Sequence, residues 1–402
     1  MLNKIKLSGN IFYLGVNDRH TERFENYFPL PYGVSYNAYL IEDEKNIVID
    51  TVEIGFVEEY ILKIKSILGE KQVDYLIVNH VEPDHSGSIK RLLCEYPQMK
   101  IVGNSKTIPM LKGFYDIENN CVTVEEGETL STGKHCLQFF TIPMVHWPES
   151  MVTYETTQQI LFSNDAFGSF GTLDGGVFDD ETRFEFYEDE MRRYYSNIVG
   201  KYGVQVQKAL AKLSGVSIKI IAPSHGLVWR ENIAKVVELY DKWSKCEAEN
   251  SVVIIYGTLY GNTARMADII ARSLAEEGIR NIRVYDVAKT HSSYLINEIW
   301  RCKGVILGSC AYNGGIFTPM ASFLKELLHI MPKNRLLSIF GSMSWGGGGV
   351  RVLEEFAENI KWNLIAPSVE IKYTTHSEDE ERLAETGKAM AKALKFCVSL
   401  HP

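Results

Sequence analysis

The chain has 402 residues, of which 45% are hydrophobic and 23% are charged, and its formal net charge is −9. This length favours two or three domains of ordinary globular composition, and the negative charge argues against non-specific binding of nucleic acid. No apolar run approaches the roughly 18 residues that span a bilayer, and the N-terminus lacks the apolar segment of a signal peptide.

Residues 1–248 are predicted to form a first domain that alternates short strands with helices. Strands are expected at 11–16, 37–41, 46–50, 75–78, 100–102, 121–124, 137–141, 151–154, 159–162 and 218–222, and helices at 56–68, 89–96, 107–115, 184–197, 204–213 and 231–245. Many strands with interspersed helices predict two sheets that are covered by helices.

A cluster of metal-binding side chains directly follows the apolar run 75–78. His80, Glu82, Asp84 and His85 lie within six residues, and Pro83 prevents the strand from continuing through them. The cluster is therefore expected in a loop at the end of a buried strand. Nitrogen and oxygen ligands without sulfur suit iron, zinc or manganese. Groups packed this tightly would repel one another without a cation, so a metal site is favoured over an ordinary surface loop.

Three further candidates, His146, Asp165 and His225, also follow predicted strands. Each one alone is better explained as a cap or a hydrogen-bonded core residue. Together with the first cluster, however, their order resembles the metallo-β-lactamase superfamily. That pattern is His-x-His-x-Asp-His, then a distant histidine, a bridging aspartate and a final histidine.

Glu82 stands where the hydrolases of that superfamily have a second histidine. The ligand set then contains four neutral imidazoles and three carboxylates, from Glu82, Asp84 and a bridging Asp165. Two ferrous ions leave a net charge of about +1, and two ferric ions with an oxo bridge return it to about +1. We hypothesise that a net charge that is the same in both redox states favours electron transfer over hydrolysis. A protein isolated with two zinc ions and esterase activity would contradict this hypothesis.

After a short polar joint at 245–250, residues 251–402 are predicted to form a second domain. Strands are expected at 251–256, 282–284, 304–308, 336–340 and 368–371, and helices at 264–277, 293–302, 317–330, 350–360 and 378–396. This alternation predicts a doubly wound, five-stranded parallel sheet that binds its ligand beyond the carboxyl ends of the strands.

Three loops at these strand ends, 257–263, 309–315 and 341–349, are rich in small and hydroxyl residues. The first leads into a helix N-terminus and offers a phosphate cradle, although alone it could equally be an ordinary turn. It matches neither Gly-x-Gly-x-x-Gly nor the P-loop pattern. The predicted binding residues are Thr258, Tyr260, Gly261, Asn262, Thr263, Ser309, Tyr312, Asn313, Gly314, Ser342, Trp345, Gly346 and Gly347. Tyr312 and Trp345 offer flat faces for a ring. Together the loops resemble flavodoxin, which implies FMN.

The two halves together resemble the flavodiiron proteins, or A-type flavoproteins. The resemblance rests on Asn79-His80-x-Glu82-x-Asp84-His85, His146-Trp147-Pro148, 164–168 and 224–226. It implies an N-terminal αββα metallo-β-lactamase-like sandwich that is joined to a flavodoxin-like doubly wound sheet. It further implies a bridged non-heme diiron site in which Glu82 and Asp165 are catalytic. His80, Glu82 and His146 would hold one iron, Asp84, His85 and His225 the other, and Asp165 would bridge them.

The activity implied by the resemblance is four-electron reduction of O2 to water, reduction of NO to N2O, or both. We favour O2 because the segment 167–171 and the N-terminal loop resemble the oxygen-reducing members. Electrons would reach FMN from rubredoxin, another small redox protein or reduced F420, and would pass from FMN to the irons. The resemblance also implies a head-to-tail homodimer, or a dimer of dimers, in which the FMN of one chain lies beside the irons of the other.

Neither nucleic acid nor a membrane is expected as a partner. The seven cysteines are scattered without a Cys-x-x-Cys pair, which indicates reduced thiols and a cytoplasmic location. Two other interpretations compete with a reductase. A metal-dependent hydrolase regulated by flavodoxin would require histidine at position 82 and zinc. A non-enzymatic electron carrier would have a decayed first domain, which the complete set of ligand candidates disfavours.

Overall fold

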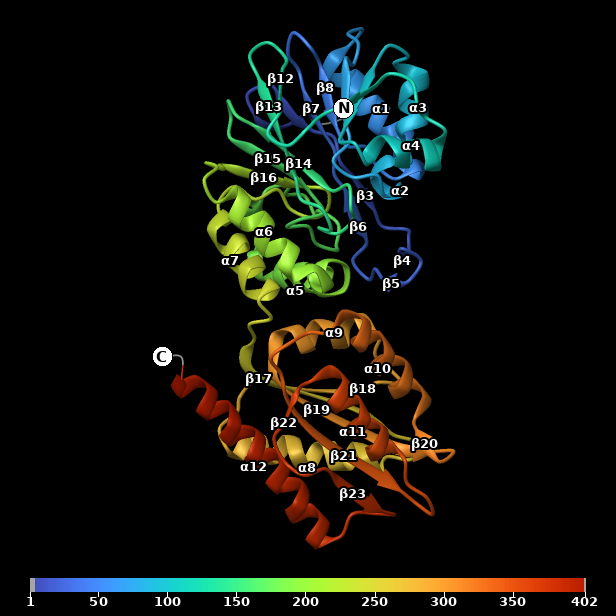
Figure 1. The fold of residues 1–402 in the computed structure, drawn as a ribbon, viewed down its shortest axis with the longest axis vertical. Coiled ribbons are helices and arrows are strands. Elements are labelled where there is room, and N and C mark those ends of the chain that lie inside the picture. Colours follow the sequence, from blue (N-terminus) through green and yellow to red (C-terminus); the bar gives the residue numbers. More distant parts are fainter. Residues whose placement is uncertain (1–3, 401–402) are drawn as a thin grey trace. The chain divides into compact units, whose positions relative to one another are not determined.

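The computed structural model describes residues 4–400 and divides into two compact units, Met1–Asp241 and Lys242–Pro402 (Figure 1). Residues 1–3 and 401–402, at the outer ends of the two predicted domains, lie outside the described residues. The division falls within helix α7 (Ile233–Ser244), just before the predicted polar joint. The last turn of α7 belongs to the second unit, where the carbonyl of Trp243 accepts a hydrogen bond from Trp300 Nε1 at 3.1 Å.

The first unit is built on two sheets. The first sheet has the order β1 (Ile5–Ser8), β2 (Ile11–Tyr13), β7 (Tyr39–Ile41), β8 (Ile47–Ile49), β9 (Tyr75–Ile77), β10 (Lys100–Gly103) and β11 (Cys121–Thr123). The second has the order β12 (Thr129–Ser131), β13 (Cys136–Thr141), β14 (Met151–Glu155), β15 (Ile160–Asn164) and β16 (Ile220–Pro223).

Helices cover both sides of this pair of sheets (Figure 1). One side carries α1 (Val57–Leu68), α3 (Ile89–Glu95) and α4 (Thr107–Tyr115), and the other carries α5 (Phe184–Tyr194), α6 (Gly203–Leu213) and α7. The inner strands β2, β7, β8, β14 and β15, together with β16, are buried at every position, because helices and the facing sheet cover both faces there. The predicted αββα sandwich is confirmed.

Several local expectations for the first unit were wrong. The predicted strand 11–16 is broken into β2 and β3 (Val16–Asp18), and β3 leaves the first sheet to pair with β6 (Val34–Tyr36). A small hairpin of β4 (Arg23–Phe24) and β5 (Phe28–Pro29) was not predicted, because two-residue strands carry no readable periodicity. The predicted helix 184–197 ends as α5 at Tyr194 and continues as a π-helical turn over Tyr195–Val199.

The predicted metal loop contains a short helix, α2 (Pro83–Ser86). Pro83 ends the strand as expected, yet it also occupies the first helical position, where its fixed φ and missing N–H are tolerated. The helix turns the chain back on itself directly after β9. Asp84 and His85 therefore lie close to His80 in space as well as in sequence.

Two buried asparagines tie the two sheets together. Asn79 donates from its side chain to Asp50 at 3.0 Å and accepts from Thr153 Oγ1 at 2.7 Å. Asn37 donates from Nδ2 to the carbonyl of Pro223 at 3.0 Å and to that of Gly226 at 2.9 Å. Both side chains are fully buried. The sheets are thus held together by polar contacts as well as by apolar packing.

We expect Asn37→Ala to destabilise the protein by about 2–4 kcal/mol. The substitution leaves the Gly226 carbonyl and the Tyr13 hydroxyl without their buried partner, and each such group costs about 1–3 kcal/mol. Urea unfolding of the full chain, followed by circular dichroism, measures the shift of the midpoint. Asn119→Ala, at an exposed position, is the control and should leave the midpoint in place. Equal midpoints for the two variants would contradict the assigned role.

The second unit is a parallel sheet with the order β18 (Ile282–Asp286), β17 (Glu249–Gly257), β19 (Cys302–Tyr312), β21 (Leu336–Met343) and β22 (Asn363–Leu364). The predicted fifth strand, 368–371, corresponds to β23 (Val369–Lys372), which pairs with the end of β21, whereas β22, which pairs with the start of β21, was not predicted. A further two-residue strand, β20 (Gly315–Ile316), pairs with the end of β19.

Helices α8 (Asn262–Glu276) and α12 (Ser377–Leu400) share one hydrophobic core with the strands, in which Ile270 and Met390 pack with Ile254, Ile306 and Phe340. Helices α9 (Ser292–Arg301), α10 (Thr318–Ile330) and α11 (Gly349–Ile360) cover the other face (Figure 1). The predicted doubly wound sheet is confirmed. Its first strand lies between the second and the third, so the ligand-binding edge is at the carboxyl ends of β17, β19 and β21.

Among the described residues, no helix combines the length and the apolar composition that crossing a bilayer requires.

Candidate metal centre and cofactor cavity

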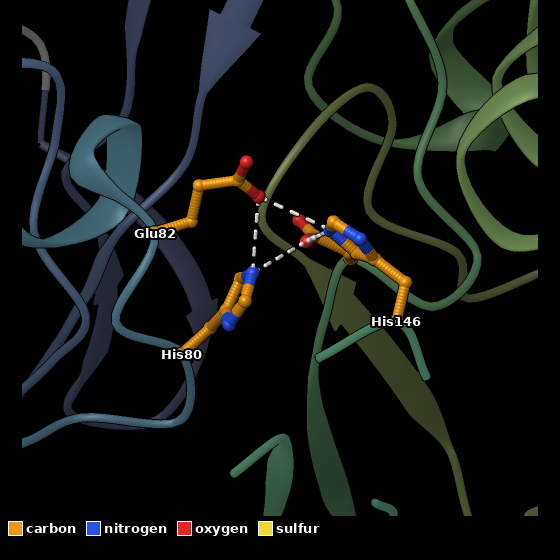
Figure 2. Close-up of side chains that lie close together, drawn as sticks. His80, Glu82 and His146 are labelled. Carbon is orange, nitrogen blue, oxygen red and sulfur yellow. Dashed lines mark hydrogen bonds and ion pairs between the residues drawn. The ribbon is translucent and has the colours of Figure 1, made fainter. Parts of the chain in front are cut away.

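The seven predicted metal ligands lie in two adjoining groups in the first unit. One group contains His80, Glu82, His146 and Asp165, and the other contains Asp84, His85 and His225. Within each group the possible ligand atoms all lie within 4.8 Å of one another. Figure 2 shows His80 and Glu82 converging on the His146 side chain, which comes from a facing segment. The structure thus brings together every residue of the predicted set.

The Asp165 carboxylate lies between the two groups. Its Oδ2 is 3.1 Å from His146 Nε2 and 3.3 Å from His80 Nε2. Its Oδ1 is 3.0 Å from His85 Nε2 and 3.4 Å from His225 Nε2. Each oxygen therefore faces a different group, which is the arrangement of a carboxylate that can contact two cations.

The backbone brings these side chains to one point because the strands that precede them end there. His80 follows β9, Asp165 follows β15 and His225 follows β16, and β15 and β16 run parallel. Gly226 has φ +73°, and a Cβ there would lie 2.0 Å from Ser169 Oγ. Only glycine allows the chain to turn so closely behind His225.

Hydrogen bonds at the outer ring nitrogens orient two of the histidines. His80 Nδ1 lies 2.7 Å from Glu149 Oε1, and His225 Nδ1 lies 2.8 Å from the Ser35 carbonyl oxygen. Both contacts leave Nε2 directed into the centre, as second partners of metal-bound imidazoles do. Sequence reasoning missed Glu149 and Ser35. Glu149 lies three residues after His146, but that spacing does not reveal that its partner is His80.

Neighbouring groups of opposite charge shift the pKa values of the histidines and carboxylates in the centre. Burial alone would lower the pKa of His146, but hydrogen bonds to Asp165 and Glu82 raise the pKa to about 9. Burial is likewise outweighed at His225, where Asp165 and Asp84 raise the pKa to about 10. Burial would raise the pKa of Asp165, yet the imidazoles of His85 and its neighbours hold that pKa well below its usual range.

Several buried polar atoms of the centre have no hydrogen-bond partner among residues 4–400. They are both carboxylate oxygens of Asp84, both ring nitrogens of His85, Asp165 Oδ1 and His225 Nε2. Folded proteins rarely leave such atoms unsatisfied, and a gathering of them indicates an ion. Nitrogen and carboxylate donors without sulfur fit iron. The residues present therefore fit a pair of metal ions.

We expect zinc uptake by the metal-free protein to release protons at about pH 8 and to release fewer above about pH 10. Below the raised pKa values of His146 and His225, both imidazoles carry protons that a metal must displace; above those values the protons are already gone. Titration calorimetry in buffers of different ionisation enthalpy counts the released protons. His225→Gln should release fewer at about pH 8, and a count that does not change with pH would contradict the prediction.

A cavity of about 700 Å³ opens beside the two metal groups. Glu82 and Asp84 reach it, and aromatic side chains that include Phe24, Tyr36 and Phe114 line much of the rest. Phe24 comes from the unpredicted hairpin β4–β5, and its ring centroid lies 5.4 Å from that of His225. The cavity gives a small molecule access to the centre.

The second unit has a cavity of about 560 Å³ at the carboxyl ends of its strands. Nine of the predicted residues line it: Thr258, Tyr260, Asn262, Tyr312, Asn313, Gly314, Ser342, Trp345 and Gly346. Four do not: Gly261, Thr263, Ser309 and Gly347. Leu259, Cys310, Ala311, Met343 and Ser344 line the cavity as well and were not predicted, because the sequence does not show which positions of a loop face a cavity.

Two of the four non-lining residues support the loops from behind. Thr263 Oγ1 lies 2.8 Å from Ser342 Oγ and joins the first loop to the third. Ser309 Oγ accepts from the Phe317 N–H at 3.4 Å. Thr258 Oγ1 accepts from the Gly261 N–H at 3.0 Å, which shapes the turn before α8. The amides at the start of α8 are thus presented for an anion such as a phosphate.

Gly348 sets how closely two of these loops approach. Its φ is +131°, and a Cβ at this position would lie 2.5 Å from the Gly314 carbonyl oxygen. Any larger residue would have to push the second and third loops apart.

We expect Gly348→Ala to weaken FMN binding by at least about tenfold, because a clash with backbone displaces a wall of the cavity. Gly278→Ala is a matched control, since Gly278 also has a positive φ (+86°) but has open space around its Cβ. Fluorescence titration of the flavin-free proteins gives both affinities. Equal losses in the two variants would assign the effect to backbone strain rather than to the loop contact.

Comparisons with known proteins agree with both halves of this description. Residues 34–226 match the family described as ODP family beta lactamase, and residues 254–387 match flavodoxin. A nitric oxide reductase of Moorella thermoacetica is 33% identical, over 97% of this chain and 99% of the relative. An anaerobic nitric oxide reductase flavorubredoxin of Escherichia coli is 32% identical, over 96% of this chain and 82% of the relative.

Solved structures are similar over the whole chain. A rubredoxin:oxygen oxidoreductase of Desulfovibrio gigas is 31% identical, with a TM-score of 0.94 and complete coverage of both chains. A flavodiiron protein of Giardia intestinalis is 26% identical, with a TM-score of 0.95, over 100% of this chain and 99% of that chain.

The chain belongs to the flavodiiron protein family. It is an oxidoreductase, as the sequence predicts, and the hydrolase and electron-carrier interpretations are not supported. The predicted cofactors, FMN and a pair of non-heme irons, are confirmed by the flavodoxin domain and by the cluster of possible metal ligands.

Proposed function

We propose that the protein reduces O2 to water at a diiron centre that receives electrons from FMN. In this proposal His80, Glu82 and His146 hold one iron, Asp84, His85 and His225 hold the other, and Asp165 bridges the two. The Asp165 carboxylate, whose two oxygens face the two groups, carries the assignment of a two-metal centre. The name of the Desulfovibrio gigas structure, which is 31% identical over the whole chain, supports O2 as the substrate. The reaction consumes four electrons and four protons for each O2 and yields two water molecules.

When bound, the two irons supply one-electron redox chemistry and open positions for the substrate. The chain itself would supply charge and orientation. Glu82 and Asp84 would place a carboxylate on each ion, and their negative charge would offset part of the cations' charge. Rings of Phe24, Tyr36 and Tyr194 surround the buried His225 imidazole at centroid distances of 5.4, 5.8 and 5.5 Å.

FMN is proposed to bind the three loops of the second unit through the residues predicted from the sequence. Tyr260 and Trp345 support this assignment, because they line the cavity while 96% and 95% of their surface remains exposed. Aromatic side chains that are left uncovered beside a cavity suit stacking on a planar ligand. The amides at the start of α8 are proposed to bind the phosphate.

The electron donor is proposed to be rubredoxin, another small redox protein or reduced F420. The name of the Desulfovibrio gigas structure supports rubredoxin. A head-to-tail homodimer, or a dimer of dimers, is proposed to bring the FMN of one chain beside the irons of another. Mixing a Gly348→Ala chain with a Glu82→His chain should restore turnover in the heterodimer. Failure to restore any would argue against this arrangement.

Reduction of two NO to N2O and water, with two electrons and two protons, is the second candidate. It is supported by the nitric oxide reductase names of the Moorella and Escherichia coli relatives. The cavity beside the metal groups is compatible with either gas, because both O2 and NO are small enough to enter it.

Side-by-side single-turnover experiments separate the two candidates. We expect the anaerobically reduced, fully loaded protein to be oxidised faster by O2 than by an equal concentration of NO. Stopped-flow absorbance of the flavin and of the irons measures both rates. Faster oxidation by NO, with N2O as the product, would reverse the assignment.

We expect Glu82→His to lose or exchange iron while FMN stays bound, because the change removes a negative charge from the first group. Metal analysis and the flavin absorbance of the purified protein report the two cofactors independently. Glu53→His is a matched control, since Glu53 lines the same cavity outside both metal groups. Full iron content and full turnover in Glu82→His would refute the role given to Glu82.

A further inference from the structure

Glu149 is a fully buried carboxylate that contacts the metal centre from outside. Its Oε1 accepts from Val81 N–H at 3.0 Å and lies 2.7 Å from His80 Nδ1. Its main-chain carbonyl accepts from Asn104 Nδ2 at 2.6 Å, which holds the residue in place. The other carboxylate oxygen, Oε2, is buried without a hydrogen-bond partner in the described part of the chain. A buried charge with one unsatisfied oxygen is costly unless a cation lies nearby.

The four histidines of the centre differ at their outer nitrogens. His80 Nδ1 meets the Glu149 carboxylate, whereas His225 Nδ1 donates to the neutral carbonyl of Ser35 at 2.8 Å. His85 Nδ1 has no hydrogen-bond partner. Among the described residues, no carboxylate bonds Nδ1 of His85, His146 or His225. The two metal groups are therefore unequal in the carboxylate that is hydrogen-bonded to an outer ring nitrogen.

We propose that Glu149 is a positioning residue that makes the two irons electronically unequal and favours the ferric state at the iron held by His80. The inference rests on the ligand assignment of the proposed function. A carboxylate on the outer nitrogen fixes the imidazole tautomer and raises its basicity toward the metal. Its negative charge also stabilises a trivalent ion more than a divalent one, because attraction grows with the charge of the ion.

The asymmetry sets the order in which the reduced centre loses electrons. When an added one-electron oxidant removes a single electron from the diferrous pair, the ferric ion forms on the His80 side, and the oxidant is reduced by one electron. The iron of the Asp84, His85 and His225 group stays ferrous at that stage. The two irons therefore have distinct roles, although one carboxylate joins them.

Glu149→Gln tests the charge, because the amide oxygen can still accept both hydrogen bonds. A matched control exists at the other end of β14: Glu155 is also fully buried, and its Oε1 lies 3.0 Å from Nδ1 of His135. That histidine is in neither metal group. Glu149→Asp keeps the negative charge but shortens the side chain, so it distinguishes an effect of charge from an effect of packing.

The measurement is an anaerobic redox titration of the full-length protein loaded with FMN and iron. Electron paramagnetic resonance follows the one-electron-oxidised iron pair. In Glu149→Gln we expect the first oxidation to become about tenfold less favourable, which raises its midpoint potential by about 59 mV. Zinc affinity of the metal-free variant should fall about 10- to 100-fold. Glu155→Gln should have the midpoint potential and the zinc affinity of the wild type. Both values for Glu149→Asp should lie closer to the wild type than those for Glu149→Gln.

Two results would overturn the inference. One is an unchanged first midpoint in an iron-loaded Glu149→Gln protein, and the other is an equal shift in Glu149→Gln and Glu149→Asp, which would indicate packing alone. Failure of the proposed function has a different signature. The wild type itself would then bind no iron pair or show no one-electron-oxidised signal. If Glu149→Gln does not fold, Glu149→Asp is compared with Glu155→Gln. Because the shorter side chain draws the charge away from His80 Nδ1, a first midpoint raised by less than about 59 mV supports the inference, and a midpoint equal to that of Glu155→Gln refutes it.

Discussion

The Asp165 carboxylate contacts both groups of predicted metal ligands in the first unit. Its two oxygens face two groups of ligands that come from different strand ends of both sheets. Because it is almost fully buried, its charge is compensated only by the surrounding imidazoles or by cations. The sandwich can be understood as the scaffold that brings these strand ends to one carboxylate. The hydrogen bonds of Asn37 and Asn79 hold the two sheets in the required register.

The metal ligands were accessible from sequence because each follows a buried strand, where rigid folds hold their chemistry. Their order along the chain identified the set before any distance was known. The hydrogen bonds to the outer ring nitrogens of these histidines could not be predicted from the sequence. Glu149 is separated from His80 by 69 positions and Ser35 from His225 by 190, and no local pattern encodes such a partner. The roles of Glu149 and Ser35 depend on tertiary structure. The same is true of short irregular segments such as the β4–β5 hairpin, which form only in the folded protein.

The second unit was predicted more completely because its strands and helices alternate with long, regular periods. The doubly wound sheet and the three loops follow from that alternation, whereas the position of β17 between β18 and β19 was not predicted. The two-residue strand β22 was not predicted, since it is too short to show a period, whereas β23 corresponds to the predicted strand 368–371. Which loop residues face the cavity was also only partly predictable: Thr263 and Ser309 hold the loops from behind.

The anchoring of the His225 loop has a consequence for how the protein matures. Asn37 holds the carbonyls of Pro223 and Gly226, on either side of His225. These hydrogen bonds fix the backbone beside His225, so the fold itself directs this imidazole toward the centre. A site made of imidazoles and carboxylates binds copper and zinc more tightly than ferrous iron. Correct loading then depends on which metal the cell supplies to the newly folded chain, and a surplus of zinc would trap it in a form that no reductant can activate.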